Sequence, residues 1–300
     1  MASGPENDAM MTQTGNQDSS LRFIFDDADI RGEWVRLDEA LHSINSAHAY
    51  SKSTRILLGQ FAIAAVLISN NLKYQGKIVL QARSAGPLNL LMVECTSDGE
   101  IRGIARGDIA AVADDPMNLI PEGQLVITIE RNGGQRYQGI VPLDDESLAR
   151  SLDHYFLQSE QLNTRFWLFA DGTRAAGIML QQLPAQIRQD AGEREKQWQE
   201  AEILAGTATA DELYSLEPAA MLHRLYHEQT VRVFEPQPVV FCCSCSRERS
   251  LNALGTLAPS ELDEIFEEQG VIDMTCEMCG TPYTFDRNDL SGLAEPPILH

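Results

Sequence analysis

Two cysteine clusters decide the fold of the C-terminal part of the chain: FCCSCSRER at residues 241–249 and TCEMCG at residues 275–280. Together they hold five of the six cysteines in the sequence. The closely spaced cysteines are Cys243, Cys245, Cys276 and Cys279. Four thiolates are the number that a tetrahedral structural zinc site requires, and a glycine follows the second pair, as is typical of a zinc knuckle. The sequence therefore predicts one Zn²⁺ held by these four cysteines.

A helix is expected to bridge the two cysteine pairs, which are separated by thirty residues. Ser260 and Asp263 predict a capping box at its start, and Gly270 predicts its end. Its shared apolar face consists of Leu262, Ile265 and Phe266. The two pairs can therefore fold as one small unit.

Two other interpretations of the cysteines are weaker. They could pack in a buried core, or they could form a disulfide scaffold. Cysteines that merely pack in a core would not be expected to fall in close pairs followed by glycine. A disulfide scaffold is disfavoured because the chain is long, shows no secretory signal, and gathers its cysteines at one end. Zinc binding is thus the favoured interpretation.

The predicted zinc site can be structural or can act as a redox switch, and the cysteine pattern alone leaves both open. Thiolates are the form of cysteine that reacts with oxidants. Zinc contributes about 10–16 kcal/mol to the folding of small zinc modules, and oxidation of the ligands would remove that contribution at once. A disulfide within Cys243-x-Cys245 would close a small, strained ring and would therefore be labile. Most four-cysteine zinc sites are, however, purely structural.

The composition argues against nucleic acid as a partner. The chain has 300 residues and a net charge of −21, and its length suits one large domain or a few smaller ones. Nucleic-acid binding needs a cluster of Lys and Arg that releases the counterions of the phosphates. After Cys242 the only Lys or Arg residues are Arg247, Arg249 and Arg287. A zinc module of this charge is a poor reader of DNA or RNA.

Neither a targeting segment nor a membrane span is predicted. Residues 1–20 contain no Lys or Arg and no apolar run, which is typical of a disordered tail rather than of a signal peptide. The apolar run from Ile56 to Ile68 is too short to cross a bilayer and contains Gln60. Free cysteines without export point to the cytoplasm.

The part that ends near Leu183-Pro184 is predicted to be a mixed α+β domain. Helical patterns cover Leu37 to Leu72 and Ser147 to Gln158. Strands are predicted at 21–24, 34–37, 77–82, 88–95, 101–105, 125–130, 137–141 and 166–169. The turn Asn132-Gly133-Gly134 predicts a hairpin between two of these strands.

A charged helical segment follows this domain. Residues 185–204 are rich in charge and poor in apolar side chains. Thr209 and Glu212 predict the cap of a second helix, and Pro218 predicts the start of a third. Helices of this composition have little stability of their own, so we expect them to depend on docking to the rest of the protein. The alternative is an ordinary solvated linker.

The remaining candidate sites receive simpler interpretations. Cys95 lies in an apolar run and is expected to be a buried hydrophobic residue. Gly103 and Gly107, with the neighbouring Arg102 and Arg106, could suggest a phosphate loop. Their spacing matches no phosphate-binding motif, so turns in a sheet are expected there instead.

From these motifs the sequence resembles the heat-shock protein 33 family of bacterial redox-regulated holdase chaperones, over nearly everything after the tail. The most specific matches are CSCSRER at 243–249 and IDMTCEMCG at 272–280. Weaker ones are GPL at 86–88, YFLQSEQ at 155–161, and HE at 227–228 with VR at 231–232. Cys242 is an additional cysteine beside the first pair. We expect it to be an uninvolved strand residue, with competition for oxidation as the alternative.

After the tail (1–20) that the composition predicts, the resemblance implies three parts: an α+β core (21–184), a metastable helical linker (185–241) and a zinc-binding redox switch (242–300). It implies that the reduced protein holds Zn²⁺ through Cys243, Cys245, Cys276 and Cys279. It also implies that oxidation forms the disulfides Cys243–Cys245 and Cys276–Cys279. Zinc loss then unfolds the switch and the linker, and the exposed apolar surface binds unfolding client proteins without ATP. The active form is implied to be a homodimer, and no enzymatic activity is implied.

Two rival functions stay open. A zinc-ribbon regulator that binds nucleic acid is disfavoured by the negative charge. A thiol-disulfide oxidoreductase could use Cys276-x-x-Cys279. However, a thioredoxin-like motif follows a strand and opens a helix, whereas this one leads into the strand-like run that begins near Pro282.

Overall fold

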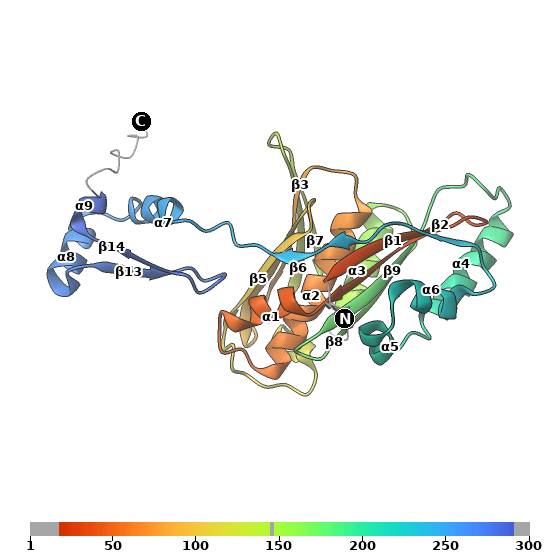
Figure 1. Ribbon diagram of the computed structural model, residues 1–300, viewed down its shortest axis with the longest axis horizontal. Helices are drawn as coiled ribbons and strands as arrows, with labels where there is room; N and C mark the ends of the chain where they lie inside the picture. Colours follow the sequence, from red (N-terminus) through yellow and green to blue (C-terminus); the bar gives the residue numbers. More distant parts are fainter. Residues whose placement is uncertain (1–17, 145–146, 291–300) are drawn as a thin grey trace, which may run out of the picture.

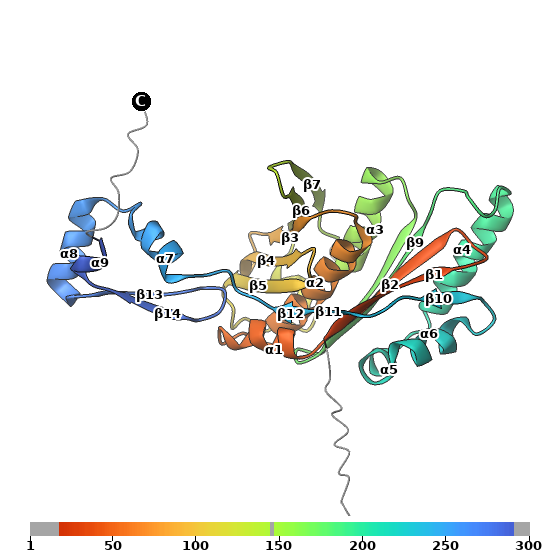
Figure 2. The same cartoon turned by 45° about the horizontal axis from the view of Figure 1, so that its top comes forward.

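The computed structural model describes residues 18–144 and 147–290, and it shows an α+β protein with two parts (Figure 1). The larger part is layered, with a long helix between two sheets and further helices on the outer face of one sheet (Figure 2). The smaller part carries both cysteine clusters and lies at one end of the molecule (Figure 1). The predicted fold class is confirmed.

The first sheet is built on strands near the start of the chain. Its strands are β1 (Ser19–Phe25), β2 (Ile30–Leu37), β8 (Thr164–Ala170), β9 (Ala175–Gln182), β10 (Val231–Val233) and β11 (Gln237–Pro238). Their order is β10-β1-β2-β9-β8, and β11 also pairs with β1. β9 is missing from the sequence prediction because it lies in the middle of the sheet with all but its last residue buried. A strand buried on both faces shows no alternation of apolar and polar residues.

The second sheet contains the remaining predicted strands. They are β3 (Gly76–Arg83), β4 (Leu88–Thr96), β5 (Glu100–Gly107), β6 (Gln124–Arg131) and β7 (Arg136–Pro142), and the short β12 (Val240–Phe241) completes the order β12-β5-β4-β3-β6-β7. The predicted hairpin joins β6 to β7. Gly103 lies inside β5, as the strand predicted at 101–105 requires, so the turn expected at this glycine is wrong. An added Cβ at Gly103 would lie 3.0 Å from Val93 Cγ2, which explains a glycine within the strand.

The helical pattern from Leu37 to Leu72 forms two helices, α1 (Glu39–Ser46) and α2 (Lys52–Asn71). α2 is longer than the apolar run predicted for it, and it lies between the two sheets, where it fills the main core. By length and composition α2 could cross a membrane, but 78% of its apolar window is buried within the protein, as in a core helix. A short 3₁₀ turn (Pro116–Leu119) and the predicted helix α3 (Leu148–Ser159) complete this part.

The start of β1 corrects the predicted tail. Ser19 already belongs to β1, so ordered structure begins inside the segment 1–20, and residues 1–17 lie outside the described part of the chain. The buried Asp18 carboxylate accepts hydrogen bonds from the first amides of α1. They belong to Asp38 (2.7 Å), Glu39 (3.2 Å) and Ala40 (2.6 Å). A capping residue from a distant part of the sequence thus fixes the beginning of the fold.

The linker helices lie on the outer face of the first sheet (Figure 2). They are α4 (Ala191–Ala205), α5 (Ala210–Ser215) and α6 (Pro218–Tyr226). The capping box of Thr209 and Glu212 and the helix start at Pro218 are confirmed. The sheet face beneath them is apolar and includes Phe23, Trp34, Ile178 and Leu180.

An extended segment, residues 231–241, leads from the linker helices to the smaller part, and we call it the strap. Its strands β10 and β11 pair antiparallel with β1, and β12 pairs parallel with β5. Between these contacts Val239 is buried in the main core. The strap therefore contacts both sheets. Strands of two or three residues give no periodic pattern, which is why the sequence does not predict them.

The smaller part, residues 242–290 of the described chain, is called the cysteine module below. Its elements are α7 (Arg247–Leu254), α8 (Pro259–Gln269), β13 (Ile272–Thr275), β14 (Pro282–Phe285) and α9 (Arg287–Leu290). β13 and β14 form an antiparallel pair. The buried apolar residues are Leu254, Phe266, Ile272 and Phe285. This core is small for a unit of its length.

The helix predicted between the cysteine pairs is α8, but its predicted start is wrong. α8 begins at Pro259, and the Glu261 carboxylate accepts a hydrogen bond from the Ala258 amide at 2.9 Å. Proline fits the first helical position, where its missing amide hydrogen costs nothing, so the capping pair predicted at Ser260 lies too far along. Gly270 ends the helix with a φ of +76°, as predicted.

Candidate metal centre

The four paired cysteines converge on one point of the cysteine module. The Sγ atoms of Cys243, Cys245, Cys276 and Cys279 all lie within 4.8 Å of one another. The Cys243 and Cys276 sulfurs are 3.7 Å apart, and the Cys245 and Cys279 sulfurs are 3.4 Å apart. A tetrahedral ion with metal–sulfur bonds of about 2.3 Å would space its ligands about 3.8 Å apart. The site could therefore hold a metal ion, and the spacing fits tetrahedral coordination.

The first cysteine pair is placed by the end of the strap and the start of α7. The Cys242 amide donates to the Ile101 carbonyl of β5 at 3.0 Å, which continues the pairing of β12 with β5. Ser246 then caps α7 by accepting from the Arg249 amide at 3.1 Å. The pair is thus held between a strand contact and a helix start.

The second cysteine pair lies in the turn between β13 and β14. The Cys276 amide donates to the Thr281 carbonyl at 2.9 Å, and the Gly280 amide donates to the Cys276 carbonyl at 2.8 Å. Gly280 has a φ of +72°, a conformation that glycine adopts without strain. The turn brings both sulfurs to one side. Since Cys276-x-x-Cys279 does not open a helix, the setting differs from that of a thioredoxin-like motif.

Two side chains that the sequence does not single out as functional contact the sulfurs. Thr281 Oγ1 lies 3.1 Å from Cys279 Sγ, and the Tyr283 hydroxyl donates to Cys245 Sγ at 3.2 Å. The only signal for them is their position in the alternating run directly after the second pair. Hydrogen bonds to a thiolate stabilise its charged form, so both residues favour metal binding.

The surroundings of the thiols are unequal. Burial raises the pKa of Cys243 to about 12. Burial also raises the pKa of Cys279, but hydrogen bonds with the Thr281 side chain and backbone outweigh it and bring the pKa to about 7. Metal binding needs thiolates, so it must release protons from this cluster. Four soft sulfur donors in tetrahedral arrangement are typical of zinc or iron–sulfur sites.

The remaining cysteines lie outside the cluster. Cys95 is fully buried in β4, as predicted, and burial raises its pKa to about 12. Cys242 is half-buried next to the cluster, but its sulfur is not among those that converge. Within residues 18–144 and 147–290, no other group of three or more His, Cys, Asp or Glu side chains converges closely enough to hold a metal.

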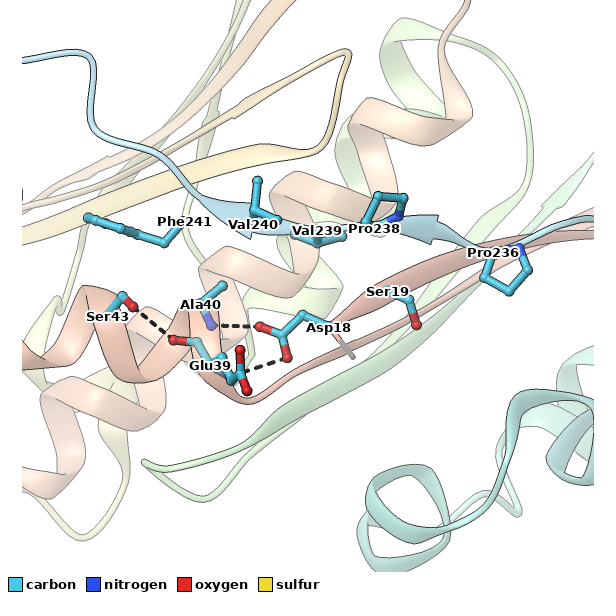
Figure 3. A pocket seen from close by; sticks show the side chains of 10 residues that line it. All are labelled: Asp18, Ser19, Glu39, Ala40, Ser43, Pro236, Pro238, Val239, Val240 and Phe241. Atoms are coloured by element: carbon cyan, nitrogen blue, oxygen red, sulfur yellow. Dashed lines mark hydrogen bonds between the residues drawn. The ribbon is translucent and has the colours of Figure 1, made fainter. Parts of the chain in front are cut away.

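A surface pocket lies where the strap passes the start of α1 (Figure 3). One wall is formed by residues around the Asp18 cap, and the other by the strap from Pro236 to Phe241. Val239 holds the strap here, because its amide donates to the Asp18 carbonyl at 2.9 Å. The strap is therefore attached to the core just before the chain reaches the cysteine cluster.

Comparison with known proteins identifies relatives over almost the whole chain. Residues 18–286 match the family described as Hsp33 protein. The 33 kDa chaperonin of Pseudomonas paraeruginosa strain PA7 is 49% identical over 281 residues, which cover 93% of this chain and 95% of that protein. The 33 kDa chaperonin of Pseudomonas fluorescens strain Pf-5 is 47% identical over 286 residues, with coverage of 94% and 95%.

A solved structure shares the fold. The crystal structure of the 33 kDa chaperonin (heat shock protein 33 homolog) from Thermotoga maritima matches with a TM-score of 0.79 and 24% sequence identity. The match covers 91% of this chain and 97% of that one. The two-part architecture described above is therefore shared at low sequence identity.

Proposed function

Because this chain belongs to the Hsp33 family, we propose that it is a redox-regulated molecular chaperone of the holdase type. In its reduced state one Zn²⁺ is bound by Cys243, Cys245, Cys276 and Cys279. After oxidation and zinc release the protein binds unfolding client proteins without ATP. The relatives named 33 kDa chaperonin support the chaperone assignment. We further propose that it acts in the cytoplasm during oxidative stress and is not an enzyme.

The observation that carries this proposal is a cluster of four sulfurs in a module with very little apolar core. The sulfurs lie within 4.8 Å of one another, and four buried hydrophobic residues form the core of the described module. Zinc supplies about 10–16 kcal/mol of folding free energy in small zinc modules. A module of this kind is expected to unfold when the metal leaves.

Oxidation by a peroxide would remove the ligands in pairs. Each disulfide forms from two thiolates, whose two electrons break the O–O bond of one peroxide and leave two hydroxide ions. Two peroxides thus convert all four ligands. The proposed products are the disulfides Cys243–Cys245 and Cys276–Cys279. Disulfide sulfurs are no longer thiolate ligands, so Zn²⁺ is released.

Unfolding of the module would next loosen the linker. The helix α4 has 15 residues but buries only Trp198, Ala201 and Ala205. Helices with so few buried residues depend on docking for their stability. Their release would uncover the apolar sheet face that includes Phe23 and Trp34. A large exposed apolar surface is suited to bind unfolding proteins, and it would also favour a homodimer of the oxidised form.

The test is suppression of light scattering by a client protein that aggregates on heating. The protein is added either reduced and zinc-loaded, or after peroxide treatment with zinc release measured in parallel. We expect only the oxidised, zinc-depleted form to suppress aggregation. Equal suppression by both forms would mean that zinc is structural, and zinc release without suppression would refute the chaperone assignment.

A pair of variants makes the test specific to the four cysteines. Cys276→Ser removes one proposed ligand, whereas Cys242→Ser changes a cysteine outside the cluster. We expect Cys276→Ser to suppress aggregation without oxidant, and Cys242→Ser to need oxidant like the unaltered protein. The opposite pattern would place the switch at Cys242.

A further inference from the structure

Two arginines of the core reach the cysteine module. Arg102 and Arg106 lie four residues apart on β5, so their side chains share one face of the strand. In both views of the molecule the loop between β13 and β14 points toward α1 and β5 (Figures 1 and 2). Each arginine contacts a residue that lies between the two cysteines of one pair.

Arg102 contacts the first cysteine pair. Its Nη1 donates to Ser244 Oγ at 2.8 Å. Its Nε and Nη2 donate to the Glu94 carboxylate of β4 at 2.9 and 2.7 Å, and that carboxylate also lies 3.3 Å from Lys77 Nζ. Burial lowers the pKa of Arg102, but Glu94 and the Cys243 side chain raise it by more. The guanidinium is therefore charged and held in a fixed direction toward the module.

Arg106 contacts the second cysteine pair. Its guanidinium forms an ion pair with the Glu277 carboxylate. His48, which follows α1, places Nε2 2.6 Å from the Glu277 carbonyl oxygen, so the Nε2–H tautomer donates there. Both partners of the ion pair are more than half exposed, at 53% and 60%. Ion pairs as exposed as this one contribute little to stability, and salt weakens that contribution further.

The charges at the centre explain why arginines are useful here. Four thiolates outweigh the two positive charges of Zn²⁺, and the sequence after Cys242 contains only three Lys or Arg residues. The guanidinium groups of Arg102 and Arg106, which contact the module, therefore stabilise its zinc-loaded form when the module is docked. We propose that Arg102 and Arg106 are positioning residues that hold the module against β5 and slow the loss of zinc. This inference rests on the proposed function in taking Zn²⁺ as the bound metal.

The test is a charge-swap cycle read out as the rate of zinc release. Arg106→Glu, Glu277→Arg and the double variant are loaded with zinc, treated with peroxide, and followed with a chromogenic zinc chelator. We expect each single variant to release zinc about 2- to 5-fold faster, the range that corresponds to exposed ion pairs. The double variant should return toward the original rate. The differences should shrink at high ionic strength, because salt screens exposed charges.

A matched control separates docking from a general loss of positive charge. Arg136 on β7 forms an exposed ion pair with Glu130, at 3.7 Å, at the far edge of the same sheet. Arg136→Glu should leave the rate of zinc release unchanged. Arg102→Gln, which loses the contact with Ser244, should release zinc faster at unchanged zinc stoichiometry.

The outcomes distinguish this inference from the proposed function. The role of the arginines would be overturned if the single variants released zinc at the same rate as Arg136→Glu. It would also be overturned if the effects of the two single variants on this rate simply added in the double variant. Either result would leave the proposed redox switch intact. Faster release that the charge swap reverses would support the role even if aggregation assays failed. A chain that binds no zinc at all would overturn both.

Discussion

The carboxylate of Asp153 lies where helix α3 meets strand β8, close to the linker. It accepts a hydrogen bond from the Phe166 amide at 3.1 Å and lies 3.3 Å from Arg165 Nη1. Arg165 Nε in turn contacts the Glu202 carboxylate of α4 at 2.7 Å. Burial raises the pKa of Asp153 to about 7, although Arg165 opposes this shift. The residue that positions a linker contact therefore titrates near neutral pH.

This shift predicts that Asp153 destabilises the folded protein as pH rises. Between its ordinary pKa and about 7, folded Asp153 keeps a proton that the unfolded chain has lost, so the free energy of unfolding falls as pH increases. Asp153→Asn carries no titrating proton and should lack this slope. We expect the difference in the free energy of unfolding between the original protein and Asp153→Asn to change by up to about 1 kcal/mol per pH unit in this range. Urea unfolding at several pH values measures this free energy for both proteins. Parallel plots of the free energy of unfolding against pH would contradict the prediction.

The linker is attached to the core at its beginning as well as along its helices. The Asp29 side chain is only 4% exposed and accepts hydrogen bonds from the backbone just before α4. The donors are the amides of Gln186 (3.1 Å), Ile187 (2.9 Å) and Arg188 (3.2 Å). Burial raises the pKa of Asp29, but these hydrogen bonds outweigh it and leave the pKa lowered. The contact is therefore present above the ordinary pKa of aspartate and lost in acid.

Removal of this attachment should make the linker easier to release. Asp29→Ala removes the buried carboxylate that accepts these three backbone hydrogen bonds, and a hydrogen bond to a charged group contributes about 1.5–3 kcal/mol. We expect faster hydrogen exchange in residues 186–205 and aggregation suppression at a lower oxidant concentration. The neighbouring Asp27 is exposed, so Asp27→Ala serves as the matched control. Equal exchange in both variants would show that Asp29 does not hold the linker.

The parts of the fold with local sequence signals could be predicted, and those set by distant contacts could not. Cysteine spacing, the end of α8 at Gly270 and the start of α6 at Pro218 depend on neighbouring residues, and the structure has all three. β9 shows no periodicity because both of its faces are buried. Asp18 caps a helix about twenty residues away, so its role is invisible in a polar tail.

The same distinction applies to the metal centre. The four converging cysteines follow from their spacing, but the contacts of Arg102 and Arg106 depend on how the module sits against β5. Neither arginine belongs to a recognisable motif, because the module residues that they contact, Ser244 and Glu277, are more than 100 positions away in the sequence. Tertiary placement, not local pattern, supplies this information.

For the protein as a whole, the module and the core should respond differently to loss of the metal. The module has a core of four buried residues, whereas the larger part has two extensive apolar clusters. Cys276→Ser should therefore lose bound zinc and protease resistance in residues 242–290. The main core, which contains no residue of α4, α5 or α6, should keep its cooperative thermal transition. Limited proteolysis and calorimetry test this, and a module that stays resistant without zinc would contradict it.

The proposed function requires that the strap transmit the state of the cysteine cluster to the linker helices. This transmission can be followed by hydrogen exchange, measured by mass spectrometry on the zinc-loaded reduced protein and on the peroxide-oxidised protein. We predict that amides in α4, α5 and α6 lose protection together with zinc release, while α2, which is buried between the sheets, keeps it. Unchanged protection of the linker helices after complete zinc release would show that loss of zinc does not reach the linker.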